Sequence, residues 1–237
     1  DSSNLGADTS GNGNHFNSSV AGATSQSTDT CTNNFATLND LDNSSVTLSE
    51  GNLKASCPSP SGCRSTIGVE SGKWYVEVKY TETASFCGVV DMSQVITSTS
   101  TSSVTLFGGS SGQPELFLNG SAQSDYSSAG TLSAGDIIQI ALDKDNNNVY
   151  FGKNGSWFGG TNWTESSPTT AHALSSGSSF VHGFRASTGS GTRINEWNFG
   201  SPSFSISSGN ADDNGNFEFA VPSGYFALCT KNLAEYG

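Results

Sequence analysis

One stretch of the chain, residues 134–157 (AGDIIQIALDKDNNNVYFGKNGSW), restricts the possible folds more than any other. Its first part alternates between apolar and polar residues, and the apolar members are Ile138, Ile140 and Leu142. Side chains two residues apart lie on the same face of a strand, so these three predict a strand with one buried face. Gln139 and Asp143 belong to the opposite face, which we expect to be exposed.

The second part of this stretch supplies a turn and a returning strand. Residues 143–148 have almost no apolar surface and strong turn preference, and Val149 and Phe151 then resume the alternation. Asn154 and Gly155 predict a second turn before Trp157, because Asn-Gly tolerates the positive φ angles of tight hairpin turns. The stretch therefore reads as strand, turn, strand and second turn.

Composition and charge narrow the class of protein further. Ser, Thr, Asn and Gly dominate the polar stretches; they form helices poorly and turns well, so we expect no amphipathic helix. A net charge of −12 would be repelled by a phosphate backbone, which argues against nucleic-acid binding. No run approaches the roughly 20 apolar residues of a membrane-spanning helix, so membrane insertion is not expected. The chain begins at Asp1 without an initiator Met, which favours a processed product or part of a longer protein.

Other alternating segments predict the remaining strands. In residues 73–80 the apolar set Trp74, Val76, Val78 and Tyr80 shares one face, and Tyr75, Glu77 and Lys79 share the other. We expect residues 85–92 to pair with this segment. Further expected strands are 46–55 (as a pair around a turn), 64–69, 104–107, 115–118, 180–184, 194–199 and a closing strand after the Pro-Ser-Gly turn at 222–224. Long loops are expected at 93–103, 158–179 and 201–216.

Residues 1–43 contrast with this pattern, because they are polar and have no apolar periodicity. Such a segment cannot bury enough surface to fold alone, so we expect an extended arm, a linker or the end of a preceding domain. Phe35 and Leu38 are the expected anchors of this arm on the main body.

Three motifs in order along the chain carry a resemblance to known proteins. They are TNNFATLN at 32–39, the central hairpin ending in VYFGKNG together with GKWYVEV at 72–78, and PSGYFALCTKNL at 222–233. The hairpin and GKWYVEV resemble the SPRY family, and the first and last motifs resemble virion proteins of tailed phages. The resemblance implies an all-β, antiparallel, concanavalin-like (SPRY-type) β-sandwich over residues 44–237. Residues 1–43 would then be an extended N-terminal arm or linker, or the end of a preceding lectin-like domain.

The five cysteines leave two readings open. Cys57 and Cys63 flank a turn-rich loop that could bring their sulfurs together, so they are either a disulfide or two free thiols. Cys87 and Cys229 lie in apolar segments and are expected to be small buried residues, whereas Cys31 has no clear partner.

No residue pattern predicts an enzyme. A sandwich glycosidase needs two carboxylates close together on one strand face, and the nearest candidates, Glu77 and Glu196, do not form such a pair; we expect both on solvated faces. The acidic turn at 143–148 lacks the glycine and distant Glu of a calcium loop, and no cysteine spacing fits zinc. A nucleophilic pair of Cys87 with a histidine lacks a third orienting group. We therefore expect no catalytic residue, metal or cofactor.

The remaining candidate is a recognition site in the loop 158–179. Trp157 and Trp163 flank a glycine-rich turn, with Asn162 between them, and exposed aromatic rings beside amides suit sugar rings. The competing interpretation of Trp157 is a cap on the core. The resemblance implies a non-enzymatic, tail-fibre-like virion module located on the virion or outside the cell. Its expected partners are other virion proteins or copies of itself in a homo-oligomer, with host-surface glycans as ligands. The alternatives are a capsid decoration protein and a secreted bacterial carbohydrate-binding or adhesin module.

Overall fold

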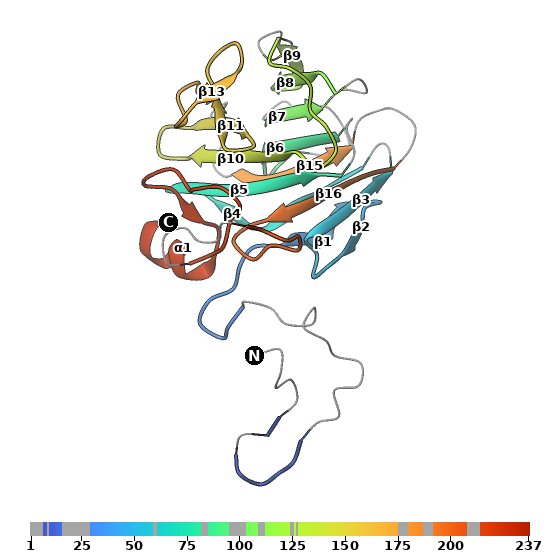
Figure 1. Ribbon diagram of the computed structural model, residues 1–237, viewed down its shortest axis with the longest axis vertical. Helices are drawn as coiled ribbons and strands as arrows, with labels where there is room; N and C mark the ends of the chain where they lie inside the picture. Colours follow the sequence, from blue (N-terminus) through green and yellow to red (C-terminus); the bar gives the residue numbers. More distant parts are fainter. Residues whose placement is uncertain are drawn as a thin grey trace.

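The computed structural model describes residues 7–8, 10–15, 29–58, 61–81, 85–94, 103–108, 112–123, 126, 128–174, 180–186, 192–207 and 214–237; the side chains of Phe107 and of 180–186 are outside the description. Two sheets pack face to face, and every strand pairing in them is antiparallel except that of β17 with β5 (Figure 1). The seven-stranded sheet has the order β1-β4-β15-β6-β7-β8-β9. The main path of the ten-stranded sheet is β13-β12-β11-β10-β5-β16-β3-β2, and β14 and β17 pair with β11 and β5. The antiparallel sandwich expected from the sequence is confirmed.

The strands are divided between the two sheets. In the seven-stranded sheet they are β1 Leu38–Ser44, β4 Gly62–Val69, β6 Ser85–Asp91, β7 Ser103–Gly108, β8 Pro114–Leu118, β9 Ser121–Gln123 and β15 Phe180–Ala186. In the ten-stranded sheet they are β2 Thr47–Ser49, β3 Lys54–Pro58, β5 Lys73–Tyr80, β10 Ile137–Asp143, β11 Asn148–Lys153, β12 Ser156–Phe158, β13 Trp163–Glu165, β14 His172–Ala173, β16 Thr192–Asn198 and β17 Phe226–Ala227.

The central hairpin forms as its alternation predicts. β10 pairs with β11 from Ile138 opposite Lys153 to Asp143 opposite Asn148, and it pairs on its other side with β5. The inward residues of both strands are fully buried between the sheets, as are Trp74 and Trp197. Asn147 and Asn154 have positive φ angles of 53° and 50°, which the turns at both ends of β11 require.

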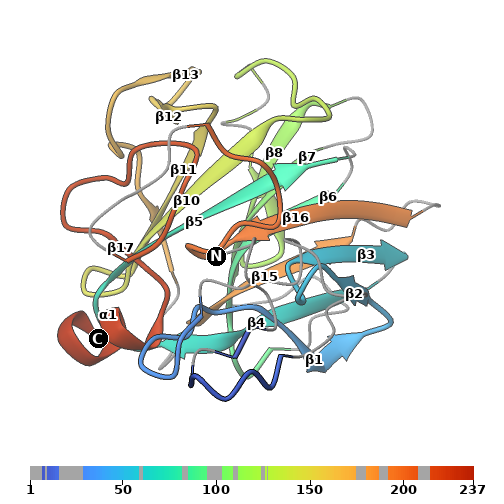
Figure 2. The same ribbon diagram turned by 60° about the horizontal axis from the view of Figure 1, so that its bottom comes forward.

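The central part of the outer face of the ten-stranded sheet is buried too, and this corrects the expectation of an exposed face. Gln139 is 1% exposed, Asp143 is 4% exposed, and Tyr75 and Glu77 are fully buried. The cover is residues 214–229, which we call the C-terminal strap; Figure 2 shows it crossing this face over β5 and β10. Phe217 from the strap packs edge-on against Tyr75 with ring centroids 4.9 Å apart.

Three further expectations are corrected. Residues 85–92 were expected to pair with 73–80, but β6 pairs with β15 and β7 in the other sheet. The expected loop 158–179 contains the short strands β13 and β14. The chain ends in a helix, α1 (Thr230–Tyr236), which follows the two-residue strand β17. Most of the loop expected at 93–103, namely 95–102, lies outside the described residues.

The two ends of the described body meet beside each other. Phe35 pairs with Cys229, the Ala36 N–H donates to the Leu228 carbonyl at 2.9 Å, and the Thr230 N–H donates to the Asn34 carbonyl at 2.9 Å. Phe35 is 8% exposed and Leu38 is fully buried, so both predicted anchors are confirmed. β1 lies in the sheet, so the sandwich takes in residues from Leu38 onward, on the arm side of the boundary expected at Ser44.

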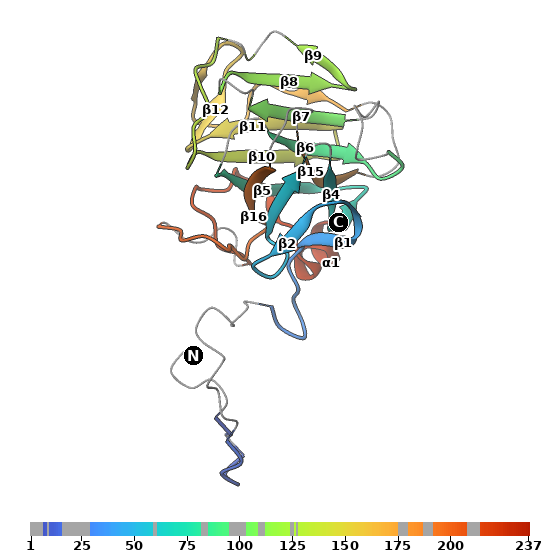
Figure 3. The ribbon, with the colours of Figure 1, turned by 90° about the vertical axis from the view of Figure 1, so that its right-hand side faces the viewer.

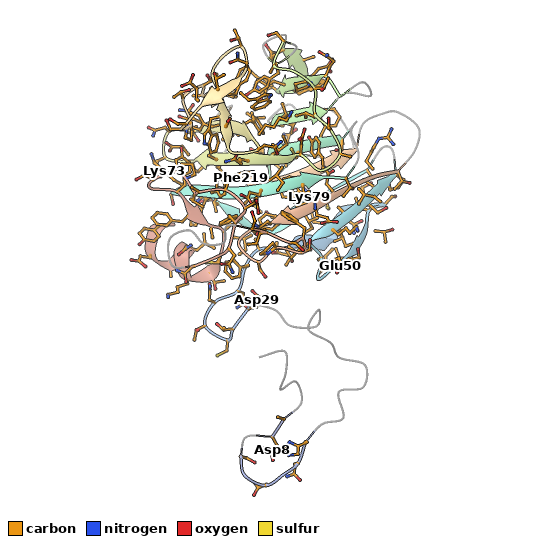
Figure 4. All side chains as sticks on the ribbon, viewed as in Figure 1. Asp8, Asp29, Glu50, Lys73, Lys79 and Phe219 are labelled. Atoms are coloured by element: carbon orange, nitrogen blue, oxygen red, sulfur yellow. The ribbon has the colours of Figure 1, made fainter. Side chains whose placement is uncertain are left out.

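The sandwich therefore has a distal edge and a proximal edge. β13 and β9 end the two sheets on one side, and β2 and β1 end them on the other. Figure 1 shows β9 and β13 at the top of the body, and Figure 3 shows β1 and β2 at its lower end, where α1 also lies. Asp29, where the chain approaches the body, lies at the same lower end (Figure 4).

Candidate functional site

The structure separates the two tryptophans that were expected to form one site. In the β12–β13 hairpin, Phe158 pairs with Trp163 and Trp157 pairs with Glu165. Paired residues share a face and consecutive residues do not, so Trp157 and Trp163 point to opposite faces of the sheet. Trp157 is 3% exposed and belongs to the cluster under the C-terminal strap. Trp157 is therefore a core residue and no part of a ligand site.

Trp163 belongs to a compact group of rings at the distal edge, which we call the distal aromatic cluster: Tyr126, Phe151, Phe158, Trp163 and His172. The Tyr126 ring stacks on Phe158 with centroids 3.7 Å apart and 15° between the planes. Trp163 packs against both rings at 5.4 and 5.5 Å. Tyr126 Oη lies 2.8 Å from His172 Nε2, a buried hydrogen bond that ties the cluster to β14.

The surface beside this cluster is rich in hydroxyls and amides and carries little charge. Asn162 is exposed in the turn between β12 and β13, where its Oδ1 accepts a 2.8 Å hydrogen bond from the Thr164 hydroxyl. The Ser128 hydroxyl donates to the Thr161 carbonyl at 3.3 Å and joins the two neighbouring loops. Residues 159–171 contain one acid, Glu165, and no base. This edge can therefore offer a half-buried indole ring and neutral hydrogen-bonding groups.

One polar atom in the cluster is left without a hydrogen bond. The Trp163 Nε1 atom is buried and has no partner among the described residues. A buried, unpaired donor costs about 1–3 kcal/mol, and the core residue Trp197 has an unpaired Nε1 atom of the same kind among the described residues.

The second group of interest is a buried carboxylate, and it corrects the expectation that Glu77 is solvated. Glu77 Oε1 accepts hydrogen bonds from Tyr75 Oη at 2.9 Å and from the Phe219 N–H at 2.8 Å. Its Oε2 accepts from Asn198 Nδ2 at 3.2 Å and from the Glu218 N–H at 2.9 Å. Burial raises the pKa of Glu77, while these four donors act in the opposite direction. Because two of these four donors are the N–H groups of Glu218 and Phe219, Glu77 fastens the C-terminal strap to β5.

The cysteines are placed as follows. Cys57 and Cys63 are both buried free thiols, on β3 and β4 of the two different sheets. Burial raises the pKa of both thiols, that of Cys63 to about 12. Cys87 and Cys229 are fully buried, as expected, and Cys31 is exposed. Burial also raises the pKa of Cys87 to about 12, which is unfavourable for a nucleophile.

Within the described ranges, no group of three or more His, Cys, Asp and Glu residues could hold a metal ion. The only helix in the described part of the chain is α1, which spans seven residues and is too short to cross a membrane. Glu196 was also expected on a solvated face, but its side chain is only 14% exposed; its Oε1 atom lies 3.4 Å from Lys54 Nζ in a partly buried ion pair.

Sequence reasoning missed Tyr126 and His172 as parts of the distal edge. Tyr126 lies outside every alternating segment, and His172 falls inside a segment expected to be a loop. The separation of Trp157 from Trp163 could have been found, because the pairing of Phe158 with Trp163 across a short turn puts Trp157 on the other face.

Comparison with known proteins agrees with this architecture. No family model matches the sequence, and no curated protein matches it either. Among solved structures, the SPRY domain of human HERC1 aligns with a TM-score of 0.49 and 16% identity, over 68% of this chain and 96% of that one. The TRIM65 PSpry domain aligns with a TM-score of 0.52 and 15% identity, over 69% of this chain and 92% of that one. With its two mainly antiparallel sheets and one short helix among the described residues, the chain has a SPRY-like, concanavalin-like β-sandwich fold.

Proposed function

We propose that this chain is a non-enzymatic structural and recognition module of a tailed-phage virion, resembling a tail-fibre domain, and that its distal edge binds host-surface glycans. The phage context is supported by the motifs at 32–39 and 222–233, which resemble virion proteins. The ligand class is supported by the chemistry of the distal edge.

The observation that carries the proposal is the half-buried Trp163 on its rigid base of Tyr126 and Phe158. An indole held in place offers a flat apolar surface for the CH face of a sugar, with little loss of side-chain freedom on binding. Exposed Asn162 and Thr164 lie in the same hairpin and can bond sugar hydroxyls.

The polarity of this edge indicates the kind of glycan. A chain with a net charge of −12 and no base in 159–171 repels sialic and uronic acids. Neutral hexoses and N-acetylated sugars carry no such penalty, so we assign them as the ligand class.

The orientation of the domain suits display. The arm joins the body near β1, whereas β9 and β13 lie at the opposite edge (Figures 1 and 3). A neighbour attached through the arm would therefore leave the distal edge free.

A glycan array that contains neutral and acidic families tests this proposal. The full chain is expected to retain neutral glycans, and Asn162→Ala and Trp163→Ala are each expected to weaken retention. Met92→Ser, which changes another exposed residue (51% exposed), should bind like the parent. Retention of acidic glycans only, or no difference between Trp163→Ala and Met92→Ser, would contradict the assignment.

A further inference from the structure

The proximal edge carries a second feature, in β1, that the fold does not require. Leu38 pairs with Ser65 and Asn43 pairs with Cys63, so residues 39–42 lie opposite the single residue Arg64. We call these four residues the β1 bulge. At its apex Leu41 is 98% exposed, the most exposed of the large apolar side chains in the described residues.

Hydrogen bonds hold the bulge at both ends. The Leu41 N–H donates to Asn39 Oδ1 at 3.0 Å, and Asn43 Nδ2 donates to the Asp40 carbonyl at 2.9 Å and to Asp40 Oδ1 at 2.8 Å. Arg64 Nη1 contacts both carboxylate oxygens of Asp42, at 2.8 and 2.7 Å. The exposed leucine therefore projects from an ordered loop with a fixed shape.

The burial of Arg64 in this position has an energetic cost. Arg64 is 6% exposed, and its Nε and Nη2 atoms are buried without a hydrogen-bond partner among the described residues. Buried polar groups are normally paired, and an unpaired one calls for an explanation. Holding Asp42, and with it the shape of the bulge, accounts for this residue.

Protection of the edge strand β1 against pairing with another sheet explains the two aspartates of the β1 bulge but not Leu41. Bulges and charges on an edge strand block pairing with another sheet, and Asp40 and Asp42 fit that role. A fully exposed leucine between them does not, because a polar residue would protect the edge equally well and remain hydrated. A single exposed leucine on a loose loop would need no explanation, but this one is braced.

We propose that the β1 bulge docks into a partner protein of different sequence, inserting Leu41 into an apolar pocket bordered by Lys or Arg side chains. Asp40 is exposed directly before the leucine and would meet the basic border of that pocket, whereas the Asp42 carboxylate is already paired with Arg64.

A second copy of this chain fits poorly. Two apposed bulges would bring like charges together, and most basic residues of the chain are already engaged. Arg64, Lys54, Lys73 and Lys153 pair with acids, Lys144 bonds to Asn147, and Lys79 lies 5.3 Å from the centre of the Phe204 ring. An anionic lipid surface would repel the same carboxylates. The proposal is also independent of glycan binding, since β1 and β13 lie at opposite edges.

The test is site-specific photocrosslinking followed by binding measurements. The full chain with Leu41→p-benzoylphenylalanine is irradiated in an extract of the cells that produce it, beside the matched control Met92→p-benzoylphenylalanine. We expect position 41, and not position 92, to crosslink one protein within an apolar pocket edged by basic residues. That protein is then purified, and its affinity for the parent and variant chains is measured.

Leu41→Ser is expected to weaken this affinity at least about tenfold, since it removes an apolar side chain that binding would bury fully. Asp40→Asn and added salt should each weaken it several-fold, and Met92→Ser should leave it unchanged. Because Leu41 makes no contact with the core, the melting temperature of Leu41→Ser should equal that of the parent. The proposal is overturned by crosslinks only between copies, by equal crosslinking from position 92, or by an unchanged affinity in Leu41→Ser.

Discussion

The substitution Glu77→Gln tests whether a buried carboxylate fastens the C-terminal strap to the sandwich. The change keeps the size and shape of the side chain but turns one acceptor oxygen into an NH₂ group. In the better of the two amide orientations, the new NH₂ group takes the place of Oε1. There the hydroxyl hydrogen of Tyr75 can rotate away, so that Tyr75 Oη accepts a hydrogen bond from the NH₂ group. The Phe219 N–H then faces a donor and loses its partner.

The expected loss of stability follows from that geometry. One buried, unpaired backbone N–H costs about 1–3 kcal/mol, and the remaining bonds lose the contribution of the negative charge. Relief of the buried charge offsets part of this loss, so we expect about 2 kcal/mol in total. For a domain of this size, 2 kcal/mol lowers the melting temperature by about 4–8 °C.

The matched control is Glu196→Gln, which removes the charge from the partly buried pair of Glu196 Oε1 with Lys54 Nζ at 3.4 Å. Because the Lys54 side chain is 35% exposed, this change should cost at most about 1 kcal/mol. Thermal and urea unfolding of both variants give the global cost. Amide hydrogen exchange at Glu218 and Phe219 reports the local loss of stability in the strap, and this exchange should accelerate only in Glu77→Gln. Equal unfolding free energies for the two variants, with unchanged exchange in the strap, would refute the reasoning.

The other predictions concern single sites. In urea unfolding, Gly155→Ala should cost about 1–2 kcal/mol more than Gly160→Ala. Both glycines have positive φ angles, but a Cβ at Gly155 would lie 3.0 Å from the Phe219 ring and one at Gly160 would meet nothing within 4 Å. Equal losses of stability would show that contact with Phe219 does not restrict position 155. Burial raises the pKa of Asp143, but hydrogen bonds from Lys73 and Asn146 outweigh it and hold that pKa below its ordinary value. A depressed pKa contributes stability above about pH 3.9, and this stability is lost as the pH falls through the pKa of the folded state. The parent should therefore be more stable than Asp143→Asn by up to about 1 kcal/mol at pH 6, and this difference should shrink in acid. A constant difference in unfolding free energy down to pH 2 would contradict this. Thiol titration without reductant should find all five cysteines in denaturant, and Cys31 should react first in the folded chain; only three (five minus two) would mean that Cys57 and Cys63 are oxidised.

Local alternation was sufficient to predict the central strands. Ile138, Ile140 and Leu142 lie between the sheets because a strand with three apolar residues at a spacing of two has one way to bury them. The same rule could not show that Tyr75, Glu77 and Gln139 are buried on the other face. Their cover comes from residues 214–229, more than 70 positions later in the chain, and local periodicity carries no information about such a contact.

The errors in pairing have a similar origin. Residues 85–92 follow 73–80 closely, and neighbouring strands often pair, but here the chain crosses to the other sheet and β10 takes the place beside β5. Helix α1 has only seven residues, too short for helical periodicity to stand out, and it forms where the Phe35–Cys229 bridge holds its first turn.

The sequence placed two of the three predicted site residues together at the distal edge. Trp163 and Asn162 were chosen as an aromatic ring beside an amide, and they do lie together in one hairpin. Trp157 was chosen by nearness in sequence, and strand parity places it in the core. Tyr126 and His172 join the cluster through tertiary contacts that no local pattern announces.

The most direct test of the central claim measures binding and turnover together on a neutral glycan retained from the array. The full chain and Trp163→Ala are titrated with this glycan, and released reducing ends are assayed in the same samples. We predict saturable binding that falls at least about tenfold in Trp163→Ala, with no reducing ends above the protein-free blank. Released sugar, or equal binding by the two proteins, would contradict recognition without chemistry at the distal edge.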